Sequence, residues 1–247
     1  MGVNYKNIDI PLKMFQNEFS RPGERPDNVP IEAIIKDAFG ESNYELEQAL
    51  SDMLDLIAFL ESEKKNVRQG DLPSLTGRER KYHKGPGDGY YQFERGSRGG
   101  GYTRADQGYR QLPKELTPAW FHDQMVMAKS QDHRWTMENL DKDQQDFVMA
   151  SYLLHNPESR SVIQSLSEGY GKSDGFVRRD VIINYWLDNH WAGWQTEENK
   201  KLGISEKVRK NKKLDAIKRI NKDYQYNPNW LKLINNLDYE FNMDQMK

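Results

Sequence analysis

The sequence contains no cysteine, and this absence excludes disulfide bonds, thiolate metal sites and cysteine nucleophiles together. Long apolar runs are missing too, because no window approaches the ~18 apolar residues that a membrane-spanning helix needs. The opening residues, M-G-V-N-Y-K-N-I-D-I-P-L-K, contain no apolar core of signal-peptide length. We therefore expect neither a signal peptide nor a membrane span.

A strong net charge is also lacking. The 36 basic and 38 acidic residues leave a formal charge of -2, so the whole chain is neither a nucleic-acid polycation nor an acidic solvating protein. Aromatic residues, by contrast, are abundant, with six Trp and thirteen Tyr. Because disordered chains are poor in aromatic residues, we expect a folded protein whose rings are packed or stacked upon.

Helical periodicity dominates the sequence and predicts a mainly α fold. After a proline-rich lead-in at residues 16–30, a short apolar stripe runs to Gly40. A longer helix is expected from about Ser42 to Lys65, with Ser42 as its N-cap. Residues 66–116 show no helical pattern. Further helices are expected at residues 118–130, 142–155, 158–168, 176–192, 204–222 and 227–236.

Glu61 interrupts the apolar face of the helix expected at residues 42–65. It lies four residues after Ile57 and seven after Leu54, so it projects from the face that should be buried. Burial disfavours the charged form of a carboxyl group and raises its pKa, which suits a general acid working near neutral pH. The structural alternative is that Glu61, close to the helix end, reaches solvent or pairs with Arg68.

Residues 85–101, G-P-G-D-G-Y-Y-Q-F-E-R-G-S-R-G-G-G, place seven glycines around three aromatic residues, Tyr90, Tyr91 and Phe93. Glycine-rich sequence is typical of flexible linkers, but a linker has no use for three aromatic residues in four positions. The pattern favours a shaped loop that presents a polar group, Gln92, to a ligand.

The stretches L-I-A-F-L-E-S at residues 56–62 and G-P-G-D-G-Y-Y-Q-F-E at residues 85–94 together resemble the lysozyme-like lytic transglycosylases, in particular the bacteriophage virion-associated type. In that superfamily a catalytic Glu followed by Ser ends a hydrophobic helix, and a Gly-x-x-Gly-aromatic-aromatic-Gln segment builds the opposite wall of the sugar groove. The resemblance implies a lysozyme-like catalytic domain at residues 42–195 with a Gly-rich loop or small β wall. Residues 1–41 would then form an N-terminal extension and residues 196–247 a basic helical C-terminal extension.

The resemblance also implies roles for individual residues. Glu61 would be the single general acid/base, and Ser62 a hydroxyl group that supports it or contacts the substrate. Gln92 would be a groove amide that donates to a sugar carbonyl or hydroxyl, with Tyr91 and Phe93 lining the site. These roles agree with the chemistry of the side chains, since amides match N-acetyl groups and aromatic faces can stack on sugar rings.

Two further parts of the sequence look similar to the phage relatives. Gln145-Asp146 opens a helix after the wall segment, and residues 186–193 form a Trp- and His-containing stretch that ends in Gly. The superfamily's usual Ala-Tyr-Asn run, whose Tyr points at the catalytic acid, is absent. Tyr185 or Tyr152 is expected to take its place. No metal-ligand spacing is found, and neither a metal nor a cofactor is expected.

The implied function is cleavage of the β-1,4 bond between N-acetylmuramic acid and N-acetylglucosamine in peptidoglycan, by a virion-associated protein that aids phage genome entry. Glu94 is the candidate for a second carboxylate, although a structural role is favoured. The expected partners are peptidoglycan glycan strands and, through both extensions, other virion proteins. The expected location is the phage particle and then the bacterial cell wall or periplasm. A hydrolytic lysozyme is one alternative, and a non-catalytic structural or DNA-ejection virion protein is another.

A basic segment at residues 200–223 carries ten Lys or Arg residues against three acidic ones. A solvated helix face is its simplest interpretation. The alternatives are docking onto an acidic virion partner, contact with DNA phosphates, and attraction to an anionic cell-wall polymer.

Overall fold

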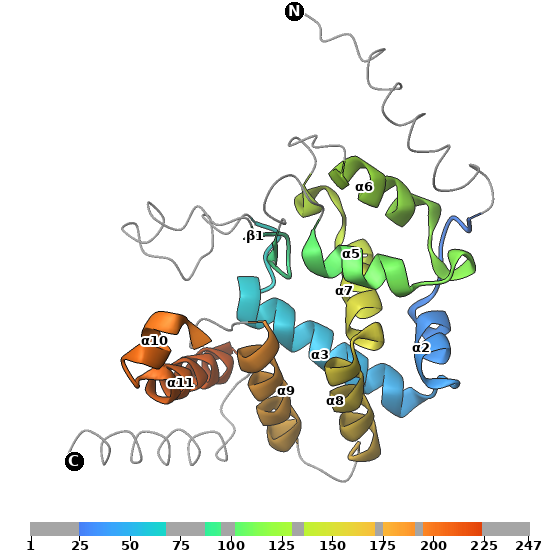
Figure 1. Ribbon diagram of the computed structural model, residues 1–247. Coiled ribbons are helices and arrows are strands. Elements are labelled where there is room, and N and C mark those ends of the chain that lie inside the picture. Colours follow the sequence, from blue (N-terminus) through green and yellow to red (C-terminus); the bar gives the residue numbers. More distant parts are fainter. Residues whose placement is uncertain are drawn as a thin grey trace, which may run out of the picture. The chain divides into compact units, whose positions relative to one another are not determined.

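The computed structural model describes residues 25–67, 87–94, 102–129, 136–170, 175–190 and 195–223. Within these residues the chain is mainly helical, as the periodicity predicts (Figure 1). The helix expected at residues 227–236 lies outside them. Contacts divide the chain into two compact units, Met1–Ser167 and Glu168–Lys247. The sequence instead predicted divisions after residues 41 and 195.

The first unit is built around α7. Its described elements are α2 (Ile31–Phe39), α3 (Tyr44–Ser62), β1 (Gly87–Asp88), β2 (Phe93–Glu94), α5 (Thr103–Gln111), η3 (Lys114–Leu116), α6 (Ala119–Lys129), η4 (Met137–Asn139), α7 (Lys142–His155) and α8 (Pro157–Glu168), which ends at the boundary. Helix α7 contacts α2, α3 and α5, and it is drawn among them in Figure 1. Because α2 packs on α7 and α3, the residues expected to form an N-terminal extension belong partly to this core.

Helix α3 begins one residue later than Ser42 would require as its N-cap. The side chain of Asn43 accepts a hydrogen bond from the Leu46 N–H at 3.0 Å, which satisfies a free donor of the first turn. Ser42 instead donates to Glu47 at 3.0 Å, so its predicted capping role is wrong. The apolar positions of α3 are buried as expected, including Leu50, Met53 and Ile57.

The start of α7 is fixed by a reciprocal cap. The Asp141 carboxylate accepts from the Gln144 N–H at 2.8 Å, and the Gln144 side chain accepts from the Asp141 N–H at 3.1 Å. After α7, Asn156 accepts from the N–H groups of Glu158 and Ser159 and begins α8, with Pro157 in the first helical position. The cap and the proline explain why the sequence placed both helices well.

Helix α5 was not predicted. Its buried residues are small, Ala105 and Gly108, so residues 66–116 lacked the large aliphatic stripe by which a helix is usually detected. The small residues allow a close approach of α5 and α7: a side-chain carbon at Gly108 would lie only 2.7 Å from the Tyr152 backbone nitrogen. Here packing against a neighbouring helix decides the structure, and propensity does not.

The second unit consists, in its described part, of α9 (Gly175–Asn189), α10 (Glu197–Lys201) and α11 (Ser205–Asp223). Helix α11 packs on α9 and buries Ala216, Ile217 and Ile220. Part of its positive charge is used inside this unit, because Arg209 pairs with Asp188 at 2.9 Å and Lys213 pairs with Asp180 at 2.8 Å.

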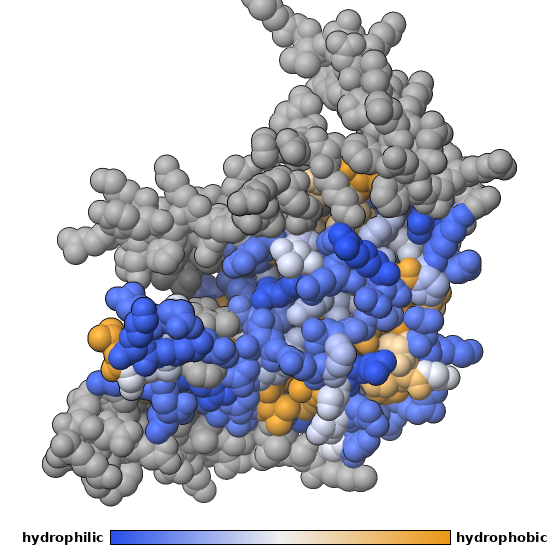
Figure 2. Space-filling view, viewed as in Figure 1, coloured by the Kyte–Doolittle hydropathy of each residue, from blue (hydrophilic) through white to orange (hydrophobic). Residues whose placement is uncertain are grey.

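The surface drawn in Figure 2 is mainly hydrophilic over the described residues. Large hydrophobic side chains that are exposed on the described part are Tyr44, Leu202 and Ile204. None of the helices in the described ranges is long and apolar enough to cross a membrane.

Candidate active site

The C-terminal end of α3 carries Glu61 as its penultimate residue, half-buried between the buried residues Leu60 and Ser62. The helix is closed by two backbone hydrogen bonds, from the Glu63 N–H to the Phe59 carbonyl at 2.8 Å and from the Lys64 N–H to the Ala58 carbonyl at 3.2 Å.

Glycine normally occupies such a helix end, because the left-handed conformation costs other residues about 1–2 kcal/mol each. Here the closing residues are Glu63 and Lys64, with φ of 55° and 58°. Gln92, with φ of 46°, is the remaining non-glycine residue of the described chain with positive φ. The residues of this kind are therefore confined to the end of α3 and to the segment that contains Gln92. Strained backbone of this kind clusters at functional sites.

Residues 87–94, which we call the wall segment, form a tight two-stranded turn. Strand β1 pairs antiparallel with β2, with Gly87 opposite Glu94 and Asp88 opposite Phe93. Only Tyr90 and Glu94 are not buried. The segment therefore contains a small antiparallel strand pair, and its role as the wall of a groove stays a prediction.

The wall segment is attached directly to the end of α3. The Ser62 hydroxyl donates to the Tyr90 carbonyl at 2.7 Å, across 28 residues of sequence. Val67, just after the helix, accepts from the Gly89 N–H at 3.1 Å and from the Gln92 side-chain amide at 2.8 Å. These three hydrogen bonds bring the two motifs of the sequence together and place Glu61 next to the anchoring residue.

Helix α7 holds the wall segment from another side. Gln145 is fully buried, and its side-chain oxygen accepts from the Tyr90 N–H at 2.8 Å. Its amide nitrogen donates to the carbonyl groups of Met137 and Leu140 and to the side-chain oxygen of Asn66, at 2.9–3.0 Å. A buried amide whose oxygen and nitrogen both form hydrogen bonds in this way fixes the neighbouring backbone in one position.

Two carboxylates near the wall segment have structural tasks. Asp88 is buried and accepts from the Tyr102 hydroxyl at 2.6 Å and from the Met137 N–H at 2.7 Å. Asp146 accepts from the Tyr91 hydroxyl at 2.5 Å and pairs with Lys142. Burial, followed by the nearby negative charge of Asp146, raises the pKa of Tyr91 well above its ordinary value. Tyr91 therefore stays a neutral hydrogen-bond donor.

Gln92 is positioned differently from the expectation. Its side-chain amide nitrogen donates to the carbonyl groups of Val67 and Gly89 at 2.8 and 2.9 Å, so both of its hydrogens are used within the protein. The predicted donation to a sugar is therefore wrong in this arrangement. The amide oxygen is buried and has no hydrogen-bond partner among the described residues. What Gln92 has left to offer is an acceptor.

The remaining predicted residues fall in two places. Tyr91 and Phe93 are both 0% exposed and pack edge to face with ring centroids 5.7 Å apart. Neither ring offers a face to a ligand, so the stacking role expected of them is not met; the half-buried ring in the wall segment is Tyr90. Tyr185 lies on α9 in the second unit, buried and edge-on to His190 with ring centroids 5.5 Å apart.

A cavity of about 440 Å³ lies beside the wall segment, between α3, α2 and the start of α7. Its lining includes Lys142 and Asp146, which also contact Tyr91, but not Glu61 or Gln92. Sequence reasoning did not identify this cavity, nor the structural roles of Asp88 and Asn66. Asn66 lies outside the motifs, and the motif that contains Asp88 assigned it no role, because the partners of both residues are distant in sequence.

No protein family, curated protein or solved structure matches the chain.

Proposed function

We propose that the protein is a peptidoglycan-degrading lytic transglycosylase with a lysozyme-like fold in its first unit. The observation that carries the proposal is the hydrogen bond from Ser62 to the Tyr90 carbonyl. It joins the Glu-Ser helix end to the Gly-aromatic-aromatic-Gln segment, the two motifs by which the sequence resembles this class of enzyme. A chance resemblance of two separate stretches would not require them to touch.

In the proposed reaction, Glu61 is the single general acid and base. Its protonated carboxyl gives a proton to the glycosidic oxygen that leaves C1 of N-acetylmuramic acid, and the substrate's N-acetyl oxygen attacks C1. The muramyl 6-hydroxyl then attacks C1 and displaces the N-acetyl oxygen, which closes a 1,6-anhydro ring. The proton of this hydroxyl passes to Glu61, which is then protonated again. No water is consumed.

The other carboxylates near the wall segment favour this one-carboxylate mechanism over a hydrolytic one. Hydrolases that cleave glycosidic bonds generally need a second carboxylate as nucleophile or base. Asp88 and Asp146 are both committed to hydrogen bonds within the protein. Glu94 is exposed on β2, and its side chain forms no hydrogen bond or ion pair with another described residue. Its role as a second carboxylate stays an alternative.

The proposal extends to the protein's setting. A virion-associated enzyme would act on the glycan strands of the host cell wall or periplasm as the phage genome enters. Other virion proteins are the proposed partners. A structural or DNA-ejection protein without activity is the competing function, and the buried rings of Tyr91 and Phe93 favour it, because they serve the core.

The test is digestion of purified peptidoglycan by the wild-type protein and by Glu61→Gln, with mass spectrometry of the released fragments. Glu61→Gln should lower the rate of release by about 10²–10⁴-fold, the usual contribution of a general acid or base. Glu63→Gln is the matched control, because it makes the same change two residues away and should leave the rate within a fewfold of wild type.

The products separate the alternatives. Fragments that end in 1,6-anhydromuramic acid, lighter by one water than reducing ends, support the transglycosylase. Reducing ends would identify a hydrolase. No release of fragments by the wild-type protein would leave the non-catalytic virion protein as the function.

A further inference from the structure

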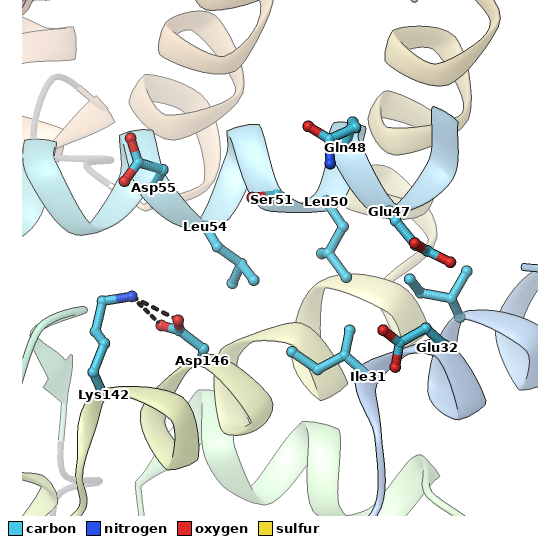
Figure 3. Close-up of a pocket in the computed structure, with 11 residues that line it drawn as sticks. Ile31, Glu32, Glu47, Gln48, Leu50, Ser51, Leu54, Asp55, Lys142 and Asp146 are labelled. Carbon is cyan, nitrogen blue, oxygen red and sulfur yellow. Dashed lines mark hydrogen bonds and ion pairs between the residues drawn. The ribbon is translucent and has the colours of Figure 1, made fainter. Parts of the chain in front are cut away.

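The cavity beside the wall segment has an anionic end, an apolar middle and an end with an ion pair (Figure 3). Glu32 and Glu47 lie together at one end, Lys142 and Asp146 lie at the other, and Leu50 and Leu54 point into the space between. Its volume of about 440 Å³ is within the range of small-ligand sites, roughly 300–1,000 Å³.

Among the described residues, no basic side chain pairs with the carboxylates of the anionic end. Neither Glu32 nor Glu47 forms an ion pair with a described residue, and Glu47 accepts only a neutral hydrogen bond, from Ser42 at 3.0 Å. Asp55, a further carboxylate of the lining, is paired with Lys64 at 2.5 Å. Glu32 lies in the first turn of α2 and Glu47 in the first turn of α3, where the helix dipole offsets part of their negative charge. A bound ammonium group between them would offset more of it.

We propose that this cavity binds a peptide side chain that ends in a primary ammonium group. The aliphatic part of a lysine side chain would lie against Ile31, the half-buried apolar residue of the lining, and place its ammonium group between Glu32 and Glu47. The ammonium of Lys142 lies at the opposite end, where it can donate to a main-chain carbonyl or carboxylate of the same peptide. This arrangement of charges selects an amphipathic ligand of one orientation.

The position of the cavity connects it to the candidate active site. Asp146 lines the cavity and accepts a hydrogen bond from the Tyr91 hydroxyl of the wall segment. Leu50 and Leu54, which also line the cavity, lie on α3, the helix that carries Glu61. Given the proposed function, on which the identity of the ligand rests, the peptide is the stem peptide that branches from the glycan strand. The cavity would then make the enzyme sensitive to the free amino group of that peptide.

The experiment uses a synthetic stem peptide without sugar, L-Ala-D-Glu-L-Lys-D-Ala-D-Ala, and the same peptide acetylated on the lysine side chain. Binding to the full-length protein is followed by chemical-shift changes of the isotope-labelled protein. The free amine should bind at least about fivefold more tightly than the acetylated peptide, as expected for two partly exposed charge pairs. The double variant Glu32→Gln/Glu47→Gln should abolish this difference.

Glu45→Gln is the matched control, because Glu45 is an exposed residue in the same first turn of α3 and does not line the cavity. It removes the same charge from the same helix terminus and should leave the preference for the free amine intact. Equal binding of the two peptides, no binding of either, or an equal loss in Glu45→Gln would overturn the proposal.

Peptide binding is measured without cleavage, so it is independent of the proposed reaction. If the wild-type protein releases no fragments from peptidoglycan but binds the amine through Glu32 and Glu47, only the proposed function fails. If Glu61→Gln abolishes release but the two peptides bind equally, only the amine site fails.

Discussion

Tyr91 is the residue whose environment has the clearest consequence for stability. Its hydroxyl is buried and donates to Asp146 at 2.5 Å, and burial raises its pKa well above the ordinary value. In the unfolded chain a tyrosine loses its proton near pH 10, whereas the folded protein holds the proton to higher pH. The unfolded state therefore binds fewer protons above this pH, and the free energy of unfolding falls as pH rises.

Replacing Tyr91 by Phe should remove this alkaline dependence while lowering stability at neutral pH. The loss should be about 1.5–3 kcal/mol, the range for a hydrogen bond to a charged group. Urea unfolding at neutral pH and at a pH above 10 measures both effects. Tyr90→Phe is the control, since the Tyr90 hydroxyl has no hydrogen-bond partner among the described residues. An equal alkaline loss in wild type and Tyr91→Phe would show that the Tyr91 proton is not held by the fold.

Gln92 shows what a motif can and cannot predict at the scale of one residue. The sequence identified it as a site residue because of its place among glycines and aromatic residues. Which of its atoms faces a ligand depends on the Val67 carbonyl, 25 residues earlier, and no spacing rule predicts that contact. For the same reason Gln92→Ala is a poor probe of sugar binding, because it also removes two hydrogen bonds that hold the wall segment.

At the scale of elements, the join between the wall segment and α7 depends on Gly89. Its φ is 80°, and a side-chain carbon there would overlap the Gln145 amide oxygen that accepts from Tyr90. Gly40 has the same φ of 80°, but a side-chain carbon there would meet no atom within 4 Å. Comparing an alanine substitution at each glycine therefore separates the free-energy cost of the left-handed backbone from the cost of the collision with Gln145.

Gly40→Ala should lower the free energy of unfolding by about 1–2 kcal/mol, the cost of the left-handed conformation for a residue with a side chain. Gly89→Ala should lower it by roughly 1–3 kcal/mol more, because the buried hydrogen bond between Gln145 and Tyr90 is lost as well. Urea titration of both variants checks the difference. Equal losses would mean that the wall segment shifts freely and that Gln145 does not fix it.

An element could be predicted where its sequence contains a capping residue, an apolar stripe or a terminating glycine or proline. Helix α7 begins with a capping box and ends before Asn156-Pro157, so the sequence placed residues 142–155 correctly. Helix α5 packs through Ala105 and Gly108, which give no apolar stripe, and was missed. The end of α3 uses Glu63 and Lys64 where a glycine would have marked the stop, and the sequence extended the helix to Lys65.

At the scale of the whole molecule, contacts divide the chain into two compact units. Ile57 on α3 is 0% exposed in the first unit, and Ile217 on α11 is 0% exposed in the second. Each unit contains fully buried apolar residues, and separate compact units of a chain can unfold independently. A chain of this kind departs from two-state behaviour.

We therefore expect two unfolding transitions in differential scanning calorimetry. Ile57→Ala should lower the midpoint temperature of one transition, and Ile217→Ala that of the other. Each variant should lose about 2–5 kcal/mol of the free energy of unfolding of its own unit. A shift of one common transition by both variants would contradict this independence.

The same pair of variants tests where the activity resides. Glu61, the wall segment and the cavity beside it all belong to the first unit. On heating, cleavage of peptidoglycan should therefore be lost at the temperature of the first unit's unfolding transition, which is the transition whose midpoint Ile57→Ala lowers. Tyr185, the expected substitute for the superfamily's tyrosine, belongs to the second unit. If cleavage instead follows the transition that Ile217→Ala lowers, the second unit contributes to the reaction and Tyr185 becomes its first candidate residue. Tyr185→Phe would then reduce cleavage without moving either transition by more than a small amount, since a buried ring of nearly the same shape is retained.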